Sequence, residues 1–389
     1  MSAPALPFGL TEQALAAAMA EADPDGLPAA GRLRAAYGPE LAAAALHQAS
    51  LRRRARSKFG DRAAGLFFTR EGLEQATRPS VAAHHAARFL AAGARRVVDL
   101  GCGIGTDALA FVAAGLDVVA VERDQATAEV AAANLAGRGQ VLCADAEEVA
   151  ESLLTPGTAA FCDPARRNSR GRLWQVQDFT PSWDLVAHLL DGSRVAGVKL
   201  GPALPHALVP ETAEAEWVTA GSETVEVGLW AGPGAAPGLN AALLLPGGRL
   251  EVPRPTAERP APRLPVGPVG RYLYEPDGAV IRAGGVALLG ARLDARLLDP
   301  QIAYLTSDRQ VPTPFATAFE VLEVLPYGLK SLRRWVRDHG VGTLEIKKRG
   351  VDVDPADLRR RLQPSGPSAA TLVLSRTPDG AVALLVQRC

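Results

Sequence analysis

The sequence predicts an α/β protein with a mostly parallel sheet, preceded by a helical region and followed by an α+β unit. In the middle of the chain, strand-like apolar runs alternate with helix-compatible stretches. Such alternation gives parallel strands joined by crossover helices that cover both faces of the sheet. Alanine-rich, helix-favouring segments come before it and a proline-rich stretch comes after it. These observations divide the chain into residues 1–78, 79–250, 251–267 (the linker) and 268–389.

The composition favours a cytoplasmic protein of two or three domains, at roughly 150 residues per domain. The formal net charge is zero, so total charge argues neither for nor against nucleic acid as a partner. The four cysteines form no C-x-x-C pair and the six histidines show no metal-ligand spacing, so we expect a reducing compartment and no metal. The chain start lacks a secretory signal, and no stretch approaches the roughly 18 apolar residues that span a bilayer.

The alanine-rich start of the chain predicts three helices. Thr11 can cap the first, which runs to Glu21, and two more are expected over residues 28–37 and 39–56. The third helix ends in a basic run at 52–58. This run is either a solvated helix end, where cations favour the C-terminal dipole, or a patch that contacts phosphates.

A glycine-rich loop follows the first strand of the middle region. Residues 97–100 have strand character and run into the alternate glycines Gly101, Gly103 and Gly105. Glycines at this spacing let the backbone turn sharply and let a ligand lie against bare main chain. A second strand at 117–121 ends on Glu122, whose carboxylate is placed to accept both hydroxyls of a ribose. The order of strand, glycine loop, helix, strand and acid predicts an adenosine-containing cofactor.

The residues around this loop distinguish between two kinds of cofactor. A dinucleotide fingerprint needs a glycine at the sixth place of G-x-G-x-x-G, where this chain has Thr106. Asp99, just before the loop, would repel a pyrophosphate but suits an amino-acid ammonium group. S-adenosylmethionine carries such a group and no phosphate. The run from Asp99 to Gly105 resembles the first motif, D-x-G-x-G-x-G, of the class I S-adenosylmethionine-dependent methyltransferases.

Two further strand ends extend the resemblance. A third strand starts at residue 140 and ends in Asp145, followed by Ala146. In the family, the acid at this place accepts a hydrogen bond from the adenine amine. A fourth strand at 159–162 ends in Asp163 and Pro164, which in the family face the transferred methyl group. Taken singly, each of these residues is more typical of an ordinary turn or a solvated strand end, but their common order favours the cofactor interpretation.

The resemblance implies a Rossmann-like class I methyltransferase core over residues 79–250, with a mostly parallel seven-stranded sheet. A helix over 181–190 precedes a fifth strand at 195–199, and the β-rich segments at 215–230 and 239–245 can supply the family's last hairpin. The implied cofactor-binding residues are Asp99, Gly101, Gly103, Gly105, Glu122, Asp145 and Ala146.

The fourth strand end carries the expected catalytic residues. Methyl transfer from a sulfonium is an in-line displacement with a neutral leaving group, so the protein mainly aligns acceptor, methyl and sulfur. If the acceptor is an exocyclic amine, the Asp163 carboxylate and the Pro164 carbonyl can orient its lone pair. Related amine methyltransferases continue with a second proline and a stacking aromatic, and this chain continues with Ala165, Arg166 and Arg167, which leaves the acceptor atom open.

Three cations near this strand end are candidates for binding substrate. Arg166 and Arg167 can pair with a phosphate or carboxylate of the substrate, or brace Asp163. Lys199, after the fifth strand, lies at the same sheet edge and can reach either substrate or Asp163. Trp174 is a candidate for the missing aromatic, although a core position is the simpler interpretation.

Two other segments resemble parts of RNA-modifying enzymes. Residues 67–73 resemble the segment that covers the methionine end of the cofactor in RNA-modifying methyltransferases, and residues 67–145 are similar to the cap-guanine N2 methyltransferases. The aromatic Phe67 and Phe68 could equally be core residues that join two domains.

The C-terminal region alternates strands with basic helices. Strands are expected at 319–325, 341–350, 370–374 and 382–386, and helices at 331–339 and 355–362. Ten cations and five anions lie within 330–361, a local excess of five positive charges.

The stretch from Ile346 to Val351, with Asp354 and Pro355 after it, resembles the THUMP-like domain that follows some bacterial methyltransferase cores. True THUMP domains bind structured RNA, so the resemblance implies RNA contact through Lys347, Lys348 and Arg349; the alternative is a surface neutralised by its interspersed acids.

These features favour an S-adenosylmethionine-dependent methyltransferase that acts on a base nitrogen of structured RNA, either tRNA or rRNA. Two alternatives stay open. One is a methyltransferase for a small molecule or a protein, and the other is a non-catalytic RNA-binding protein with a vestigial cofactor pocket. The sequence does not predict the oligomeric state, or whether the N-terminal helices bind RNA.

Overall fold

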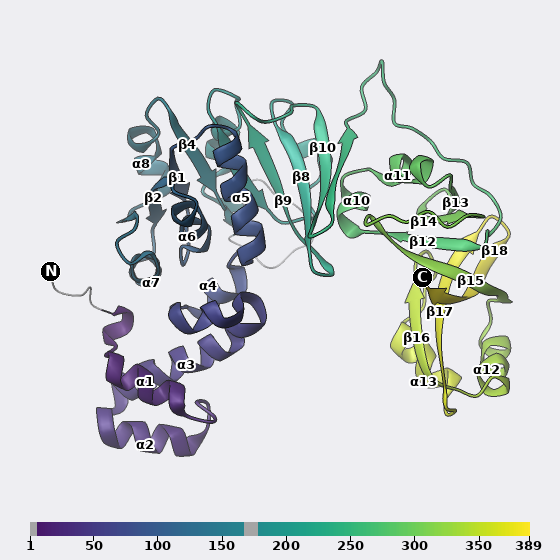
Figure 1. The fold of residues 1–389 in the computed structure, drawn as a ribbon, viewed down its shortest axis with the longest axis horizontal. Coiled ribbons are helices and arrows are strands. Elements are labelled where there is room, and N and C mark those ends of the chain that lie inside the picture. The colour runs from purple at the N-terminus through teal and green to yellow at the C-terminus, as the bar shows by residue number, and fades with distance from the viewer. Residues whose placement is uncertain (1–5, 167–177) are drawn as a thin grey trace. The chain divides into compact units, whose positions relative to one another are not determined.

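The computed structural model describes residues 6–166 and 178–389 (Figure 1). The chain divides into two compact units, one of residues 1–220 with 225–238 and one of residues 221–224 with 239–389. Among the described residues, none of the helices is both long and apolar enough to cross a bilayer.

The first unit begins with the helices that the sequence predicts. Thr11 caps the first of them, because its hydroxyl accepts a hydrogen bond from the Ala14 N–H at 3.2 Å. Fully buried alanines such as Ala42 and Ala45 let the helices pack closely. The elements are η1 (Pro7–Gly9), α1 (Glu12–Ala20), α2 (Leu27–Tyr37), α3 (Pro39–Phe59) and η2 (Gly60–Gly65).

Two side-chain amides hold the segment that leads from these helices to the sheet. Gln48 donates to the Phe68 carbonyl at 2.6 Å and accepts from the Phe68 N–H at 3.1 Å. Asn134 makes the same pair with Phe67 at 3.0 and 2.8 Å, and also donates to the Ile104 carbonyl at 2.9 Å. Both phenylalanines are buried, which confirms the interpretation of them as core residues. The helices α4 (Arg70–Gln75) and α5 (Pro79–Ala91) follow.

Within the described residues, nine strands form one sheet, in the order β11-β10-β8-β9-β7-β4-β1-β2-β3. Strands β3, β2, β1, β4 and β7 are parallel neighbours, whereas β9 runs antiparallel to β7 and β11 runs antiparallel to β10. The strands are β1 (Arg96–Leu100), β2 (Asp117–Glu122), β3 (Gln140–Cys143), β4 (Thr158–Cys162), β7 (Ala196–Leu200), β8 (Glu214–Ala220), β9 (Glu223–Ala231), β10 (Leu239–Leu245) and β11 (Gly248–Pro253).

The α/β class is confirmed, but the expected mostly parallel sheet of seven strands was wrong, because the sheet is mixed and has nine. Only residues 246 and 247 join β10 to β11. A link this short permits an antiparallel pair and excludes the crossover that a parallel pair needs. Strand β11 also places residues 248–253 in the sheet, where the sequence suggested the start of a linker.

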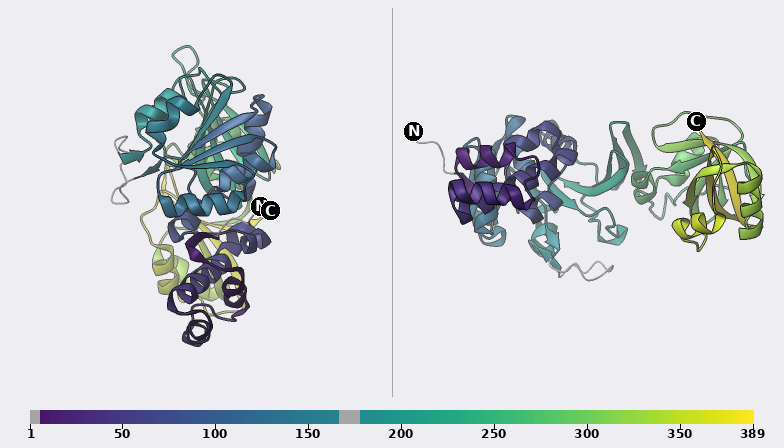
Figure 2. Two further views of the ribbon diagram at one scale, coloured as in Figure 1. Left: turned by 90° about the vertical axis from the view of Figure 1, so that its left-hand side faces the viewer. Right: turned by 90° about the horizontal axis from the view of Figure 1, so that it is seen from below.

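The strand order reverses between β1 and β4. From β1 the chain passes through α6 (Thr106–Ala113), β2 and α7 (Gln125–Leu135) to β3, and then returns through α8 (Ala146–Leu153) to β4 on the other side of β1. Right-handed crossovers in opposite directions put helices on both faces of the parallel strands (Figure 2). Ligands of open α/β sheets bind in the crevice outside the carboxyl ends of the strands at such a reversal, here β1 and β4.

Between β4 and β7 the chain forms a short antiparallel pair and a helix. The pair consists of β5 (Ala165–Arg166) and β6 (Phe179–Thr180), and α9 (Trp183–Leu189) follows it. A second short helix, η4 (His206–Leu208), lies between β7 and β8.

The second unit contains a seven-stranded sheet in the order β13-β14-β12-β15-β18-β17-β16. Leu332, Val336, Leu358 and Leu362 pack two basic helices against it. The predicted elements from residue 319 onward are present, whereas those between 272 and 307 were not predicted. Its elements are β12 (Tyr272–Pro276), α10 (Gly278–Arg282), α11 (Val286–Arg292), β13 (Arg296–Asp299), β14 (Ile302–Ser307), β15 (Ala316–Pro326), α12 (Leu329–Asp338), β16 (Val341–Lys348), α13 (Pro355–Leu362), β17 (Ser368–Thr377) and β18 (Gly380–Arg388).

Candidate active site

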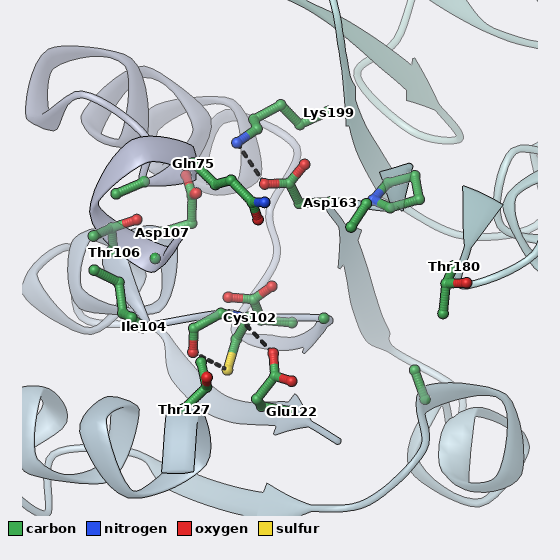
Figure 3. A pocket seen from close by; sticks show the side chains of 18 of the residues that line it. Gln75, Cys102, Ile104, Thr106, Asp107, Glu122, Thr127, Asp163, Thr180 and Lys199 are labelled. Atoms are coloured by element: carbon green, nitrogen blue, oxygen red, sulfur yellow. Dashed lines mark hydrogen bonds and ion pairs between the residues drawn. The ribbon is translucent and has the colours of Figure 1, made fainter. Parts of the chain in front are cut away.

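A pocket of about 1010 Å³ lies in the first unit, at the carboxyl ends of β1, β2, β4 and β7 (Figure 3). Every residue that the sequence proposed for the cofactor lines it, except Gly105, together with Asp163, Pro164 and Lys199. One wall comes from α4 and the residues on either side of it, so the N-terminal helices contribute to the pocket as well.

The glycine loop takes a backbone path that a residue with a side chain resists. Gly101, Gly103 and Gly105 have φ of +83°, +55° and +81°, in the left-handed region. The N–H groups of Gly101 and Cys102 both donate to the Val121 carbonyl at 2.9 Å, which ties the turn to the end of β2. At Gly101 and Gly103 the loop therefore presents bare main chain to the pocket.

Glu122 at the end of β2 is held from two sides. Its Oε2 accepts a hydrogen bond from the Gly103 N–H at 3.1 Å, and its Oε1 accepts one from the Asp124 N–H at 2.9 Å. Each carboxylate oxygen keeps further acceptor capacity. The side chain is thus oriented by the backbone and can still accept hydroxyl groups from the pocket (Figure 3).

Asp99 is the most unusual group in the pocket wall. It is 1% exposed, and neither of its oxygens has a hydrogen-bond partner within the described part of the chain. Burial raises the pKa of Asp99 well above its usual range, and the neighbouring carboxylates Asp107 and Asp163 raise it further. A buried and unpaired carboxyl is costly, and a cationic ligand group that donates to it would remove that cost.

Asp145 and Ala146 lie at the start of α8. Asp145 caps this helix, because its Oδ1 accepts a hydrogen bond from the Glu147 N–H at 2.9 Å. Both residues line the pocket, as do Ala126 and Thr127 from α7. This side of the pocket therefore has small side chains and a carboxylate, Asp145, that can accept a further hydrogen bond from a ligand.

Asp163 follows β4 and is paired with Lys199. The Lys199 Nζ lies 2.5 Å from Asp163 Oδ2 (Figure 3). This contact follows from the sheet, since β4 and β7 are parallel neighbours with Cys162 opposite Val198. Burial raises the pKa of Asp163 above its usual range, although the Lys199 ammonium opposes the rise. Of the two partners that the sequence left open for Lys199, the structure places it on Asp163.

The remaining candidates near this strand end are only partly described. Pro164 is buried and lines the pocket. The backbone of Arg166 pairs with Phe179 in the β5–β6 ladder. Arg167 and Trp174 lie outside the described residues.

A buried polar cluster beside the pocket escaped the sequence analysis. His85 Nδ1 lies 2.8 Å from Asp107 Oδ1, and its Nε2 lies 2.7 Å from Glu226 Oε1. The Thr77 hydroxyl donates to Asp107 Oδ2 at 2.5 Å and accepts from Lys199 Nζ at 3.1 Å. The one available signal was a polar residue, His85, within the apolar stripe of α5.

Three cations of the basic run at the end of α3 donate hydrogen bonds to backbone carbonyls of the protein itself. Arg52 donates to the Leu66 carbonyl at 2.8 Å and lies over the Phe67 ring. Arg53 donates to carbonyls of residues 21 and 22, and Lys58 donates to carbonyls of residues 73 and 74. For these three cations the structure favours a role in holding the fold over one in contacting phosphates.

The three C-terminal candidate cations differ from one another. Lys347 Nζ lies 2.7 Å from Glu275 Oε2, and Arg349 lies 3.7 Å from the same carboxylate and over the Tyr304 ring. Lys348 is the last residue of β16 and is exposed. Lys347 and Arg349 are therefore engaged inside the second unit, and Lys348 faces solvent.

Comparisons with known proteins identify relatives of the whole chain and of two of its segments. Residues 316–388 match the family described as THUMP domain-like, and residues 12–55 match a domain of unknown function, DUF8688. The crystal structure of a protein from Porphyromonas gingivalis W83 that carries a methyltransferase assignment superposes with a TM-score of 0.78 at 23% identity, over 97% of this chain and 98% of that one, and shows the same fold.

Two curated relatives carry an activity in their names. Both are described as uncharacterized S-adenosylmethionine-dependent methyltransferases of Mycobacterium tuberculosis, from strains H37Rv and CDC 1551. Each is 33% identical over 347 residues, which is 85% of this chain and 92% of the relative. The pocket fits S-adenosylmethionine: the unpaired Asp99 carboxylate suits its ammonium group, the backbone at Gly101 and Gly103 leaves space for its main body, and Glu122 suits its ribose. The chain belongs to the S-adenosylmethionine-dependent methyltransferases, and it carries a THUMP-like domain at its C-terminus.

Proposed function

We propose that this methyltransferase modifies a base nitrogen in structured RNA, either tRNA or rRNA, in the cytoplasm. The observation that carries the proposal is the pairing of an acid-lined acceptor site in the first unit with a THUMP-like unit whose basic helices face solvent. The first feature suits an N–H acceptor group, and the second suits a phosphate backbone.

The cofactor side of the pocket has a residue for each part of S-adenosylmethionine. Asp99 would receive the ammonium group, Glu122 the ribose hydroxyls and Asp145 the adenine amine, while Gly101, Gly103 and Ala146 leave room for the main body. Gly105, with a φ of +81°, allows the turn into α6. When bound, S-adenosylmethionine supplies a methyl group on a positively charged sulfur. The protein's own task is then to orient the acceptor and keep the cofactor in place.

The acceptor side of the pocket is rich in carboxylates. Asp107, Asp163 and Glu226 line it, with Lys199 as the cation among them. Such a lining disfavours phosphate and favours a group that donates hydrogen bonds, such as the exocyclic amine of a nucleobase. Asp163 has one oxygen on Lys199, and we assign the other, with the Pro164 carbonyl, to orienting the acceptor amine. Arg166, Arg167 and Lys199 remain candidates for contacts with the rest of the substrate.

The second unit offers a surface for RNA. Its exposed cations lie on the outer faces of α12 and α13 and on β16. Within the described residues, Lys330, Arg334 and Lys348 have no carboxylate partner, whereas Arg360 and Arg361 share Asp357. We therefore assign phosphate contact to Lys348 with the outer face of α12, and we assign Lys347 and Arg349 to holding β16 against Glu275.

Incubation with S-adenosylmethionine carrying a labelled methyl group and total tRNA and rRNA tests the proposal. We expect label in RNA, in a base rather than a ribose after digestion to nucleosides. RNA binding should also weaken steeply with salt, with a log–log slope of about −0.9 per phosphate contacted in a duplex. Label in protein or small molecules alone would favour the alternative substrates, and no transfer to any fraction would favour a non-catalytic RNA-binding protein.

A further inference from the structure

Six side chains form a continuous polar chain that runs from the core of the first unit to the acceptor side of the pocket. In order, they are Glu226, His85, Asp107, Thr77, Lys199 and Asp163, and each adjacent pair lies within 3.1 Å. They come from β9, α5, α6, the α4–α5 link, β7 and the end of β4. Five separate parts of the fold thus converge on the carboxylate that faces the acceptor.

His85 at the inner end of the chain is a fixed cation. It is 1% exposed, and both of its ring nitrogens face carboxylates, which accept hydrogen bonds when ionised. Only the imidazolium form donates from both nitrogens. Burial lowers the pKa of His85, but the charges and hydrogen bonds of Glu226 and Asp107 outweigh this effect and raise it to about 10. His85 in turn holds the pKa of Asp107 below its usual range against the effect of burial.

Thr77 connects Asp107, which is paired with His85, to Lys199, which is paired with Asp163. Because the ionised Asp107 can only accept hydrogen bonds, the Thr77 hydroxyl must donate its single proton to Asp107. The lone pairs of the hydroxyl then face Lys199, which donates to it at 3.1 Å. The direction of each hydrogen bond in the chain is therefore fixed by the cation at its inner end, and Lys199 is anchored on the side away from Asp163.

We propose that Thr77, backed by Asp107 and His85, is a positioning residue that anchors the Lys199 ammonium against Asp163, and so keeps Asp163 ionised with its free oxygen toward the acceptor. This inference rests on the proposed role of Asp163 in orienting the acceptor amine. Without the hydroxyl, Lys199 loses its second acceptor and is free to move away from Asp163. Asp163 then loses part of the opposing charge that stabilises its ionised form.

The charged groups around Asp163 determine the direction of the expected change. Lys199 from β7 favours ionisation of Asp163, while Asp107 from α6, Glu226 from β9 and Asp99 from β1 oppose it. Burial lowers the pKa of Lys58, and the nearby charges of Lys199 and Arg78 lower it further. The charge of His85 compensates those of Asp107 and Glu226. Within the described residues, Lys199 is the cation that donates to Thr77, so we expect removal of the hydroxyl to raise the pKa of Asp163.

The experiment measures the titration of Asp163 by ¹³C NMR in protein labelled at aspartate carboxyl carbons, with the signal assigned through Asp163→Asn. In Thr77→Val we expect Asp163 to titrate about one pH unit higher than in the wild type, which is about tenfold in its ionisation constant. Thr77→Ser, which restores a hydroxyl, should return the titration to the wild-type position. Thr158 is as buried as Thr77, and Thr158→Val, which removes a hydroxyl that bonds to the Thr155 hydroxyl outside this chain of six, serves as the matched control.

The activity profile gives a second readout. The acid limb of kcat for labelled methyl transfer to total RNA should move up by the same amount in Thr77→Val, while the affinity for S-adenosylmethionine stays within about twofold. Thr77→Ala removes the hydroxyl without added volume and replaces Thr77→Val if that variant melts early. An unchanged Asp163 titration in a folded Thr77→Val or Thr77→Ala protein would overturn the inference. Absence of RNA methylation by the wild type would instead overturn the proposed function, and the NMR titration would still decide the role of Thr77.

Discussion

Replacing Asp99 with asparagine tests two effects of this buried carboxyl, one on the stability of the free protein and one on cofactor binding. The two side chains have nearly the same shape, so the substitution removes the charge and little else. In the free protein Asp99 is buried without a partner within the described residues, and burial raises its pKa. Its folded-state pKa therefore lies above the unfolded value, so the free protein binds the extra proton and loses stability as pH rises through this window. Asp99→Asn should lack that loss.

The same substitution should weaken cofactor binding. A hydrogen bond between a charged donor and a charged acceptor contributes about 1.5–3 kcal/mol, so Asp99→Asn should bind S-adenosylmethionine about tenfold to 150-fold more weakly. Binding of an ammonium group lowers the pKa of Asp99 and expels its proton. The affinity of the wild type should accordingly rise with pH, by at most about tenfold per pH unit, and level off above the raised pKa of the free protein.

Isothermal titration calorimetry with S-adenosylmethionine and with its demethylated product, each across a pH series, measures both effects. Both ligands carry the ammonium, so both should lose affinity to a similar degree in Asp99→Asn, and the pH dependence should flatten. An Asp99→Asn protein that binds both ligands as tightly as the wild type, with the same pH dependence, would refute the reasoning.

Three further predictions concern the other parts of the account. Asp163→Asn should lower labelled methyl transfer by about 100-fold or more while leaving the calorimetric affinity for S-adenosylmethionine nearly unchanged, and equal turnover would contradict its assigned role. His85→Gln should lower the free energy of unfolding, measured with denaturant at pH 7, by about 3–5 kcal/mol, because it leaves two buried carboxylates without their cation. The folded-state pKa of His85 is raised to about 10, so its contribution is full below the unfolded value and is lost as pH rises through about 10; a wild type without this decline would contradict the assignment. Arg334→Glu with Lys348→Glu should weaken tRNA binding and reduce its salt slope by about 1 for each phosphate that the protein no longer binds, with cofactor affinity unchanged, whereas an unaltered slope would place RNA elsewhere.

The part of the site that the sequence predicts consists of residues at strand ends. Glu122 ends a strand and Gly101 and Asp163 lie just after one, and the carboxyl ends of parallel strands must meet at one edge of the sheet. Local pattern is therefore enough to bring them together. Lys199 follows the same rule, although the sequence alone could not decide between its two partners.

The polar chain that leads to Asp163 cannot be predicted from such a pattern. Thr77 lies in the α4–α5 link, while His85, Asp107 and Glu226 lie on three different elements, and none of the four stands in a motif. Their contacts depend on which helix faces which strand after packing. The expected number of seven strands was wrong for a related reason. Strands β10 and β11 extend the sheet as a hairpin, and the position of this hairpin next to β8 depends on tertiary packing. Charge counting likewise could not show that Glu275 engages Lys347 and Arg349 while Lys348 is left facing solvent.

The central claim is that the protein moves a methyl group from S-adenosylmethionine to a base nitrogen of RNA. Mass spectrometry of nucleosides tests it most directly, after incubation of tRNA and rRNA with the wild type or Asp163→Asn and S-adenosylmethionine bearing a deuterated methyl group. The account predicts a deuterated N-methyl nucleoside that the wild type forms and the variant does not. Deuterium found only outside RNA, or in RNA to the same extent with both proteins, would contradict it.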